Sequence, residues 1–517
     1  MKESLKRLFC LLICLMLFPA AAYGENVEDS LIVGMLSSRT TEIRPLTPVE
    51  RDVVSLYGMV YESLVAIDDN GLPQPLLAEN WSETGGGKTW TFTLRENVAF
   101  SDGTPLTAND VVASCQFILN LAKNKEVSDN GFYQNIRYLV SSITATDERT
   151  VVVKAARSYY GLLYSMTFPV VPASQVEMAN PLGTGPYVIS SFEAGSYLWL
   201  VANPAWWQMQ PQVQEIMVMF YANNKDMITA FEYGRVDTVF TRSVAAAQYK
   251  SGINSLSIAY STRQLETLML NHKEFPLESL KVRQAIRYAI NKDLIAQNVY
   301  MGMTVDADTP VSSDSWLYYD QERTFVYNPE RALELLAEDG WSDTDGDGMM
   351  DKVVDGKARN LHFQLYVYED PENDVRFETA NMIADFLAAV KIGVKVNPVS
   401  YSGMMERFKS GSFDLALCAF QMDVVPDCGF FLIKGNQQNY CRYVSSEMTS
   451  LFKTLRTNQD REEFAYTSQA IQQQFANDVP FICLFYRAGA ILTRKMFSTV
   501  RSIREFELLR GIEAFGR

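Results

Sequence analysis

The sequence has little of the side-chain chemistry on which most enzymes depend. Only two histidines occur among its 517 residues, His272 and His362, and no GxSxG segment is present. A Ser-His-Asp triad or a Cys-His dyad needs an imidazole beside a nucleophile, and neither histidine stands in such a motif. Two distant histidines also make a metal site of several imidazoles hard to assemble. The sequence therefore favours no enzymatic function.

Cysteine is scarce and has no metal-binding or redox spacing. Beyond the N-terminal segment five cysteines remain, at positions 115, 418, 428, 441 and 483. None of them forms a CxxC pair, so neither a zinc ribbon nor a thioredoxin-like motif is predicted. An odd number leaves at least one thiol free. Cys428 and Cys441 are the closest pair in sequence, and two interpretations stay open: a disulfide that pins a loop near a ligand, or two buried free thiols.

Long apolar runs are absent except at the N-terminus. Basic residues at positions 2, 6 and 7 precede an apolar run over residues 8–22, and small residues follow up to Gly24. This order is typical of a secretory signal peptide, which we predict over residues 1–24. No other run approaches the roughly 20 residues that span a bilayer. We therefore expect an exported protein without its own membrane span, with an uncleaved N-terminal anchor as the alternative.

A lipid anchor is not predicted. Such an anchor needs a cysteine directly after a small residue at the cleavage site, whereas Cys14 follows Ile13 inside the apolar run. The protein is therefore expected in the periplasm or outside the cell, peripheral to the cytoplasmic membrane.

Charge excludes one large class of partners. The chain has 61 acidic and 46 basic residues, which gives a formal net charge of −15. An acidic surface repels phosphates, so we expect no nucleic-acid partner. The same charge is compatible with cationic or zwitterionic ligands, or simply with a well-solvated exterior.

The clearest local pattern lies in residues 61–114. Residues 89–94 (TWTFTL) alternate strictly between threonine and apolar side chains, which predicts a half-buried strand. Three glycines at 85–87 predict the turn before that strand, because glycine tolerates positive φ. A second turn is predicted at 101–105, after which Thr107 or Asn109 caps a helix that begins at Asp110.

These segments resemble the family-5 extracellular solute-binding proteins that serve ABC importers. The resemblance extends along most of the chain and appears in the expected order. The matching segments are 61–64 (YESL), 183–187 (GTGPY), 203–207 (NPAWW), 234–237 (GRVD), 282–290 (VRQAIRYAI) and 327–341, a helix that begins at Asn328-Pro329 and ends in Gly-Trp.

The resemblance implies an α/β, type-II periplasmic-binding-protein fold with two lobes. Residues 25–266 and 489–517 would form lobe 1, with an extra subdomain over about 50–175, and residues 267–488 would form lobe 2. The chain would cross between lobes at 267–271 and again near 479–483. The resemblance further implies that the ligand lies in the cleft between the lobes and is buried when the two-segment hinge closes.

The family also points to a ligand-binding segment at 420–427. In peptide-binding members this region carries an aspartate that pairs with the α-ammonium of the peptide; Asp423 matches it and Asp427 matches a second acid. A carboxylate suits the task because a buried ammonium needs a compensating charge. Phe420, Tyr486 and Arg487 are predicted to line the same cleft. The alternatives are that Asp423 caps a loop and that Phe420 belongs to the core.

One segment resembles a calcium loop. Asp343, Asp345, Asp347 and Asp351 stand at relative positions 1, 3, 5 and 9, with glycine at position 6, as in the first nine residues of an EF-hand loop. Position 12 is Val354 in place of the bidentate glutamate. Many family members carry a similar turn, so either a structural calcium ion or a metal-free turn is possible; no other cofactor is expected.

The resemblance implies a function without covalent chemistry. We expect a monomeric receptor that captures a small solute, a peptide first of all, and delivers it to an ABC permease. A sensor that docks on a membrane receptor is the alternative, as is a binder of a sugar or metal chelate.

Overall fold

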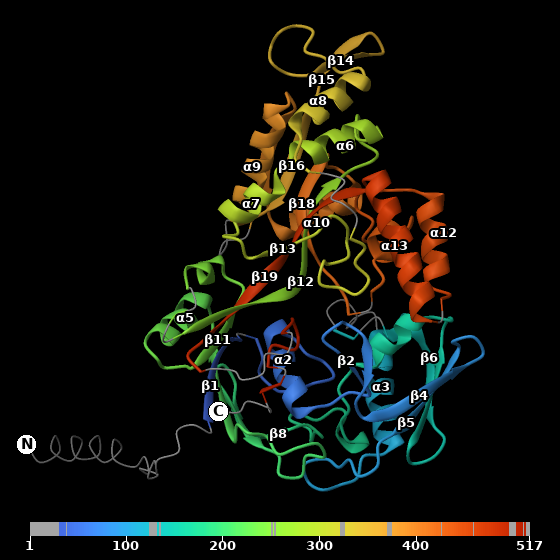
Figure 1. The fold of residues 1–517 in the computed structure, drawn as a ribbon, viewed down its shortest axis with the longest axis vertical. Helices are drawn as coiled ribbons and strands as arrows, with labels where there is room; N and C mark the ends of the chain where they lie inside the picture. Colours follow the sequence, from blue (N-terminus) through green and yellow to red (C-terminus); the bar gives the residue numbers. More distant parts are fainter. Residues whose placement is uncertain are drawn as a thin grey trace, which may run out of the picture.

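Two lobes lie one above the other along the long axis of the molecule (Figure 1). The computed structural model describes residues 30–512 except 38, 124–131, 134–135, 250–251, 253–254, 321–325, 370–374, 425, 459, 496–502 and 510. The predicted signal peptide, residues 1–24, lies outside the described residues. The first lobe, at the bottom of Figure 1, contains the elements up to β11 and the C-terminal segment around Arg504. The second lobe, at the top, contains α6 to α13.

One large mixed sheet runs through both lobes, in the strand order β17-β16-β18-β12-β19-β11-β1-β10-β9-β8, with β13 paired to β19. Its first-lobe strands are β1 (Ser30–Leu36), β8 (Tyr187–Glu193), β9 (Tyr197–Ala202), β10 (Glu215–Tyr221) and β11 (Thr238–Thr241). The remaining strands are β12 (Leu256–Leu270), β13 (Thr304–Asp306), β16 (His362–Tyr368), β17 (Gly393–Val399), β18 (Leu415–Gln421) and β19 (Phe481–Thr493).

The two crossings between the lobes are long paired strands. β12 and β19 run antiparallel through the middle of the molecule, and β18 of the second lobe pairs with the end of β12. The crossing predicted at 267–271 is therefore the last part of a 15-residue strand. The second crossing strand, β19, begins at Phe481, directly after Pro480. Two crossing segments of this kind are typical of a hinge between two lobes.

A separate four-stranded sheet lies within the region predicted as an extra subdomain. Its order is β4-β5-β7-β6, and α3 packs on it. The bounds are β4 (Ala78–Thr84), β5 (Thr89–Leu94), β6 (Val140–Ala145), β7 (Thr150–Ala155) and α3 (Ala108–Lys123). β5 confirms the predicted strand residue for residue, with its apolar face buried. The three glycines before it all have positive φ, between 65° and 72°.

Helix α3 begins two residues earlier than predicted. The Asp110 carboxylate accepts hydrogen bonds from the backbone N–H and the hydroxyl of Thr107, at 2.9 and 2.8 Å. The Asp110 side chain thus reaches back to Thr107, which is one half of the capping-box pattern, while the backbone N–H of Asp110 donates to the carbonyl of Thr107 at 3.1 Å. These contacts at the first turn accompany the start of the helix at Ala108.

Helices cover the sheet in the second lobe. They are α6 (Leu280–Ala289), α7 (Lys292–Asn298), α8 (Pro329–Glu338), α9 (Val375–Ala389), α10 (Tyr401–Ser410), α11 (Gly429–Leu432), α12 (Ser446–Leu455) and α13 (Arg461–Asp478). Asn328 caps α8 by accepting from Arg331 N at 2.9 Å, as its position before Pro329 predicts. The helical pattern over 279–299 proves to be two helices, because Asn291 caps α7 after a break at Ile290.

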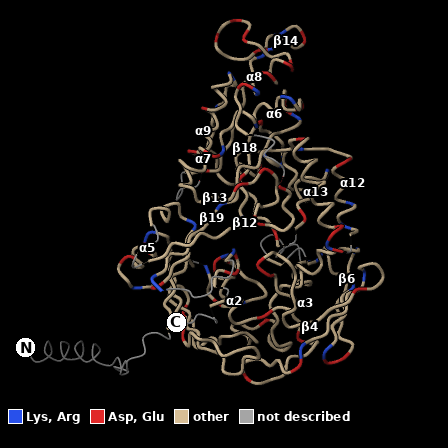
Figure 2. Tube along the Cα trace, in the orientation of Figure 1, with Lys and Arg blue, Asp and Glu red and all other residues tan. Residues whose placement is uncertain are grey.

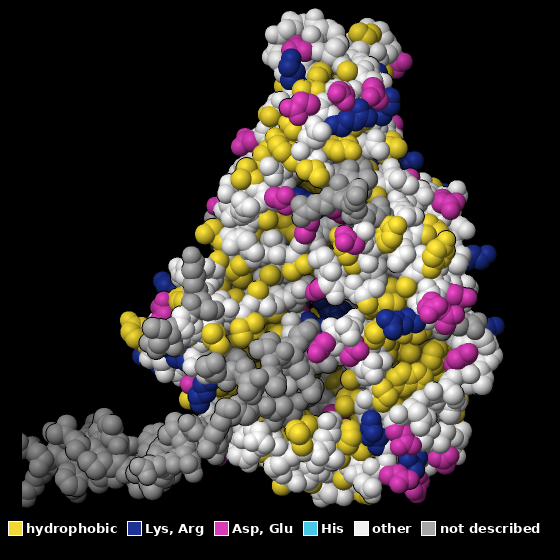
Figure 3. All heavy atoms as spheres, in the orientation of Figure 1, with side chains coloured by type: hydrophobic (Ala, Val, Ile, Leu, Met, Phe, Trp, Pro, Cys, Tyr) yellow, Lys and Arg dark blue, Asp and Glu magenta, His cyan; other side chains and the backbone are white. Residues whose placement is uncertain are grey.

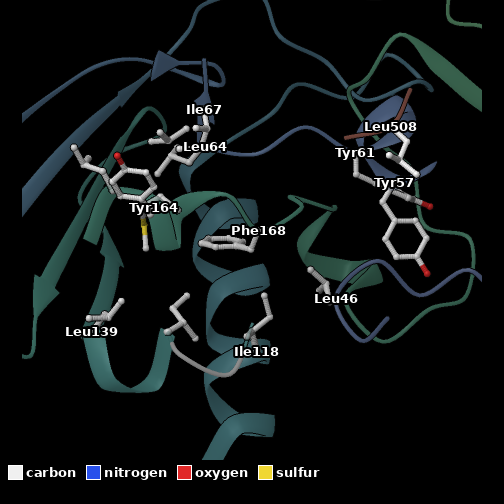
Figure 4. Close-up of a cluster of buried hydrophobic side chains, with 14 of the residues drawn as sticks. Leu46, Tyr57, Tyr61, Leu64, Ile67, Ile118, Leu139, Tyr164, Phe168 and Leu508 are labelled. Carbon is white, nitrogen blue, oxygen red and sulfur yellow. The ribbon is translucent and has the colours of Figure 1, made fainter. Parts of the chain in front are cut away.

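The core of the first lobe joins distant parts of the chain. Figure 4 shows Tyr57, Ile118, Phe168 and Leu508 among buried apolar side chains of one cluster. Tyr57 belongs to α2 (Arg51–Val60), whereas Leu508 belongs to the C-terminal segment. The segment around Leu508 is therefore packed into the first lobe.

Three of the segments that carry the resemblance meet at one buried carboxyl group. Glu62, within the YESL segment, is 5% exposed and accepts hydrogen bonds from Thr184 of the GTGPY loop and from three side chains at 206–208. Gly183 is required here because a Cβ would lie 1.9 Å from the carbonyl oxygen of Val60. These contacts therefore stabilise the scaffold of the first lobe.

The cysteines of the described residues are free thiols, so the disulfide interpretation is wrong. Cys428 and Cys441 are both buried among apolar side chains, and the Cys441 thiol donates to the Asn439 carboxamide oxygen at 3.3 Å. Burial raises the pKa of both thiols to about 12. Such thiols are structural and unreactive.

Charges are distributed over both lobes. Figure 2 shows basic and acidic positions intermingled along the trace, in line with the solvated exterior that the composition suggests.

Candidate functional site

A cavity of about 260 Å³ lies between the two lobes. Its walls come from four places: first-lobe residues such as Ile67 and Tyr164, the crossing strand at 261–263, second-lobe residues such as Trp316 and Asp423, and the C-terminal segment at 503–505. The space-filling view shows a hollow at the boundary between the lobes, with acidic side chains near its rim (Figure 3). Enclosed, mixed polar and apolar sites of this kind are where proteins hold small molecules.

The lobes are in contact around the cavity. Trp316 of the second lobe donates from its indole N–H to the Tyr164 hydroxyl of the first lobe at 2.9 Å. Nearby, the backbone N–H of Tyr160 donates to the carbonyl of Asn458 at 3.0 Å. The aromatic ring of Phe464 packs against Tyr160 and Trp316. These contacts describe a closed arrangement of the lobes.

Asp423 lies in the wall of this cavity, half-buried, two residues beyond the end of β18. The β12–β18 ladder extends one step past Gln421, since the N–H of Met422 donates to the carbonyl of Arg263 at 2.8 Å. One oxygen of the Asp423 carboxylate accepts from the N–H of Val424 at 2.6 Å. The strand end thus places this acid in the wall of the cavity, and its contact with a ligand stays a prediction.

Asp427 also lines the cavity, but its charge is already compensated. Its two carboxylate oxygens accept from the Arg456 guanidinium at 2.6 and 3.0 Å, and one of them accepts from Gly429 N at 2.9 Å. Arg157 of the first lobe approaches the same carboxylate to 3.9 Å. The geometry assigns Asp427 to holding the loop, α12 and the first lobe together.

The three other predicted ligand-binding residues have different positions. Tyr486 lines the cavity and donates from its hydroxyl to the Pro310 carbonyl at 2.6 Å. Phe420 instead lies in the core, 7% exposed, with its ring against Phe431. Arg487 is outside the cavity wall: it donates to the Arg242 carbonyl at 3.2 Å and lies over the Tyr300 ring. Phe420 thus takes the core position that was its alternative, and the ligand contact of Arg487 stays a prediction.

Sequence reasoning missed several residues of the cavity. Arg263, Arg504 and Trp316 all contribute to its wall. None stands in a recognisable motif, and no local pattern distinguishes them from other arginines and tryptophans of the chain. They are brought together only by the fold.

The predicted calcium loop lies at the far end of the second lobe, next to β14 (Asp351–Val354) and β15 (Lys357–Asn360) (Figure 1). Carboxylate oxygens of Asp343, Asp345 and Asp351 approach within 4.8 Å of one another, whereas Asp347 is not part of this group. Asp347 instead accepts from the backbone N–H of Met349 at 2.8 Å.

All three acids already have hydrogen-bond partners, and that of Asp345 is the backbone N–H of Asp347 at 3.2 Å. Lys391 donates to Asp343 at 2.8 Å, and the Asp351 carboxylate accepts from the backbone N–H of Thr344 at 2.7 Å and from its hydroxyl. The structure tests neither interpretation of this loop, a structural calcium ion or a metal-free turn.

Comparison with known proteins identifies the class of scaffold. Residues 73–440 match the family model of bacterial extracellular solute-binding proteins, family 5 Middle. The chain belongs to this family. The predicted resemblance is thereby confirmed, and solute binding is the activity of the class.

Relatives of this solute-binding protein differ in what their names say they bind. It is 26% identical over 486 residues to the oligopeptide-binding protein AppA of Bacillus subtilis (strain 168). The aligned region covers 88% of this chain and 86% of that protein. It is 24% identical over 493 residues to heme-binding protein A of Haemophilus influenzae, covering 89% and 87%.

Solved structures confirm the two-lobed, type-II periplasmic-binding-protein fold of this solute-binding protein. The crystal structure of NikA from Brucella suis in complex with Fe(III)-EDTA superposes with a TM-score of 0.78, at 19% identity, over 94% of this chain and 99% of that chain. Within the described residues, none of the helices is both long and apolar enough to cross a membrane.

Proposed function

We propose that this protein captures a small solute with a free ammonium group, a short peptide first of all, and delivers it to an ABC importer permease. The observation that supports this proposal is the half-buried Asp423 in the wall of a cavity enclosed by both lobes. The oligopeptide-binding relative provides a second, weaker support. In this proposal the protein is exported and acts as a monomer without any covalent step.

The chemistry of Asp423 fits an ammonium ligand. A cation that leaves water loses its hydration, and it remains bound only where charge and hydrogen bonds compensate that loss. The other acid of this segment, Asp427, is paired with Arg456, which holds the loop to α12. Tyr164, Trp316 and Tyr486 supply aromatic surface beside it for apolar parts of the solute.

Lobe closure links capture to delivery. Trp316 and Tyr164 come together only when the lobes meet, so a solute that contacts both lobes stabilises this state by its differential affinity. A permease that recognises the closed form would then receive loaded protein in preference to empty protein.

The test is native mass spectrometry of protein purified without refolding, followed by identification of the released small molecules. The variant Asp423→Asn keeps an oxygen that can accept from Val424 N but removes the charge. Asp385→Asn, an exposed acid on α9, removes the same charge away from the cavity and serves as the control.

We expect amine-bearing solutes on the wild-type protein and on Asp385→Asn, and their loss from Asp423→Asn. Solutes without an amine, or amine-bearing solutes retained equally by Asp423→Asn, would contradict the role of Asp423.

A further inference from the structure

Arg263 lies at an irregular point of the crossing strand β12. The β12–β19 register shifts between Ser261, paired with Ala488, and Leu265, paired with Tyr486. Three residues of β12, 262–264, therefore face the single residue Arg487 of β19. Bulges of this kind redirect a side chain out of the regular alternation and occur often beside functional sites. At this bulge the chain presents Arg263 to the cavity between the lobes.

Hydrogen bonds hold the backbone of the bulge on both sides. Arg263 N donates to Glu505 Oε2 at 2.8 Å, and its carbonyl accepts from Met422 N at 2.8 Å. The Thr262 hydroxyl donates to the carbonyl of Arg487 at 2.7 Å, across the bulge. The position of Arg263 is thus fixed by the first lobe's C-terminal segment on one side and by the second lobe on the other.

The side chain, in contrast, is not bonded directly to a carboxylate among the described residues. Its guanidinium lies over the ring of Phe506, at 5.9 Å from the ring centre. Burial is the main cause of the lowered pKa of Arg263 and Arg504 lowers it further, whereas Asp423, Glu507 and Glu505 act in the opposite direction without cancelling these effects. A half-buried guanidinium without a directly bonded carboxylate is only partly compensated, so an anion that enters the cavity supplies hydrogen bonds that the protein does not.

The other arginine of the cavity wall is fully engaged. Arg504 donates to Glu507 at 3.0 Å and to the carbonyls of Ile67 and Asp68 at 2.6 and 2.8 Å. The nearby acid Glu505 is 2% exposed and is paired with Arg51. Of the two basic side chains in the described wall, Arg263 alone is available to a ligand.

We infer that Arg263 binds a carboxylate of the solute, and that the solute is therefore a compact zwitterion with its ammonium on Asp423. The contact of the ammonium with Asp423 rests on the proposed function, whereas the contact of the carboxylate with Arg263 does not. Both residues lie where β12 and β18 end their ladder, and the Asp423 carboxylate is near enough to act electrostatically on Arg263. Arginine suits a carboxylate because its planar fork donates two parallel hydrogen bonds.

The size of the cavity agrees with a short ligand. At about 260 Å³ it lies just below the roughly 300–1,000 Å³ of pockets that hold drug-sized molecules. Both charged ends of the ligand must fit in this one space. An amino acid or a dipeptide satisfies this requirement, whereas a long peptide needs an open channel.

The experiment compares three dipeptide pools: unmodified, C-terminally amidated and N-terminally acetylated. Binding of each pool is measured by calorimetry on wild-type protein from which co-purified solutes have been removed, and on Arg263→Gln. Arg235→Gln, an exposed arginine of the first lobe, is the control for loss of one positive charge. Arg263→Lys tests whether charge without the fork suffices.

We expect the wild-type protein and Arg235→Gln to bind the unmodified pool roughly 10- to 150-fold more tightly than the amidated pool, the range for a charged hydrogen-bonded contact. Arg263→Gln should bind both pools equally and weakly, and Arg263→Lys should recover part of the difference.

Three results would overturn the inference. Equal wild-type affinity for amidated and unmodified dipeptides shows that no carboxylate is recognised, and this result needs no variant. A preference for the free carboxylate that survives in Arg263→Gln assigns the contact to another residue. If none of the three pools binds, the claim that the solute is a compact zwitterion fails. The acetylated pool separates the two proposals: if it binds as tightly as the unmodified pool, the role of Asp423 fails while that of Arg263 stands.

Discussion

The indole N–H of Trp316 donates to the hydroxyl of Tyr164 across the boundary of the lobes, at 2.9 Å. The same hydroxyl donates onward to the carbonyl of Gly71 at 2.9 Å. All three residues line the cavity. A short relay of hydrogen bonds therefore closes one side of the cavity, and the closed state depends on a phenol that belongs to the first lobe.

Tyr164→Phe should weaken solute binding more than it weakens folding. The variant keeps the ring and removes both hydrogen bonds of the hydroxyl, to Trp316 and to Gly71. Only the first crosses between the lobes, and it is worth about 0.5–1.5 kcal/mol, or roughly 2- to 12-fold in affinity. Calorimetry with the solute that co-purifies with the wild-type protein measures this change. Tyr466→Phe, at a position that is 76% exposed, is the matched control. Equal affinities of the two variants would show that the relay does not contribute to closure.

Glu62 should make stability depend on pH. Burial is the main cause that raises its pKa from the ordinary 4.5 to about 7, while hydrogen bonds from Trp207, Thr184 and Trp206 lower it. Between these two values the unfolded chain is ionised and the folded chain is protonated. The contribution of Glu62 is therefore fully present below about pH 4.5 and is lost as the pH rises to about 7, by on the order of 3 kcal/mol.

Chemical denaturation between pH 4 and 8 measures this slope. Glu62→Gln cannot ionise, so its free energy of unfolding should fall less across pH 4.5–7 than that of the wild-type protein, whatever its absolute value. Glu406→Gln, at an exposed position of α10, should keep the wild-type slope. Parallel curves for Glu62→Gln and the wild-type protein would mean that Glu62 is ionised in the folded state.

Residues that are neighbours in the sequence determine much of the scaffold, but they do not determine the site. The strand at 89–94 and the cap at Asn328 follow from residues next to each other, so the sequence predicts them correctly. The cavity instead joins Tyr164, Arg263, Trp316 and Asp423, which are separated by tens to hundreds of positions. No periodicity or spacing relates them, and only Asp423 could be proposed, because it matches a segment of the family.

The direction of a side chain is equally hard to predict. Phe420 and Asp423 lie three residues apart at the end of one strand, yet the first is in the core and the second in the cavity wall. The strand ends between them, and the regular alternation ends with it. Family resemblance located the segment but not which of its side chains face the ligand.

Asp427→Asn should cost stability rather than binding. Removing the carboxylate leaves the Arg456 guanidinium, 25% exposed in its side chain, without its partner, and breaking such a pair costs about 2–4 kcal/mol. Urea unfolding measures the loss. Arg157→Gln, which removes only the 3.9 Å contact of a 36% exposed side chain, should cost much less. An unchanged unfolding midpoint in Asp427→Asn together with lost solute binding would make Asp427 a ligand-binding residue.

Calcium should leave the stability of this protein unchanged. Lys391 already compensates Asp343, Asp351 is held by Thr344, and Val354 offers no ligand at position 12. A bound ion would stabilise the folded state in proportion to its occupancy. We therefore expect the same melting temperature with excess EDTA and with millimolar calcium. A calcium-dependent rise that disappears in Asp345→Asn would instead establish a structural calcium site.

The central claim is that a solute is held between the lobes with its ammonium on Asp423. The most direct test is a crystal structure of the protein purified with its own solute. We predict a compact molecule in contact with both lobes, with a nitrogen about 2.7–3.2 Å from the Asp423 carboxylate and an acidic group on Arg263. A solute whose cationic group lies away from Asp423, or a solute bound outside this cavity, would contradict the account.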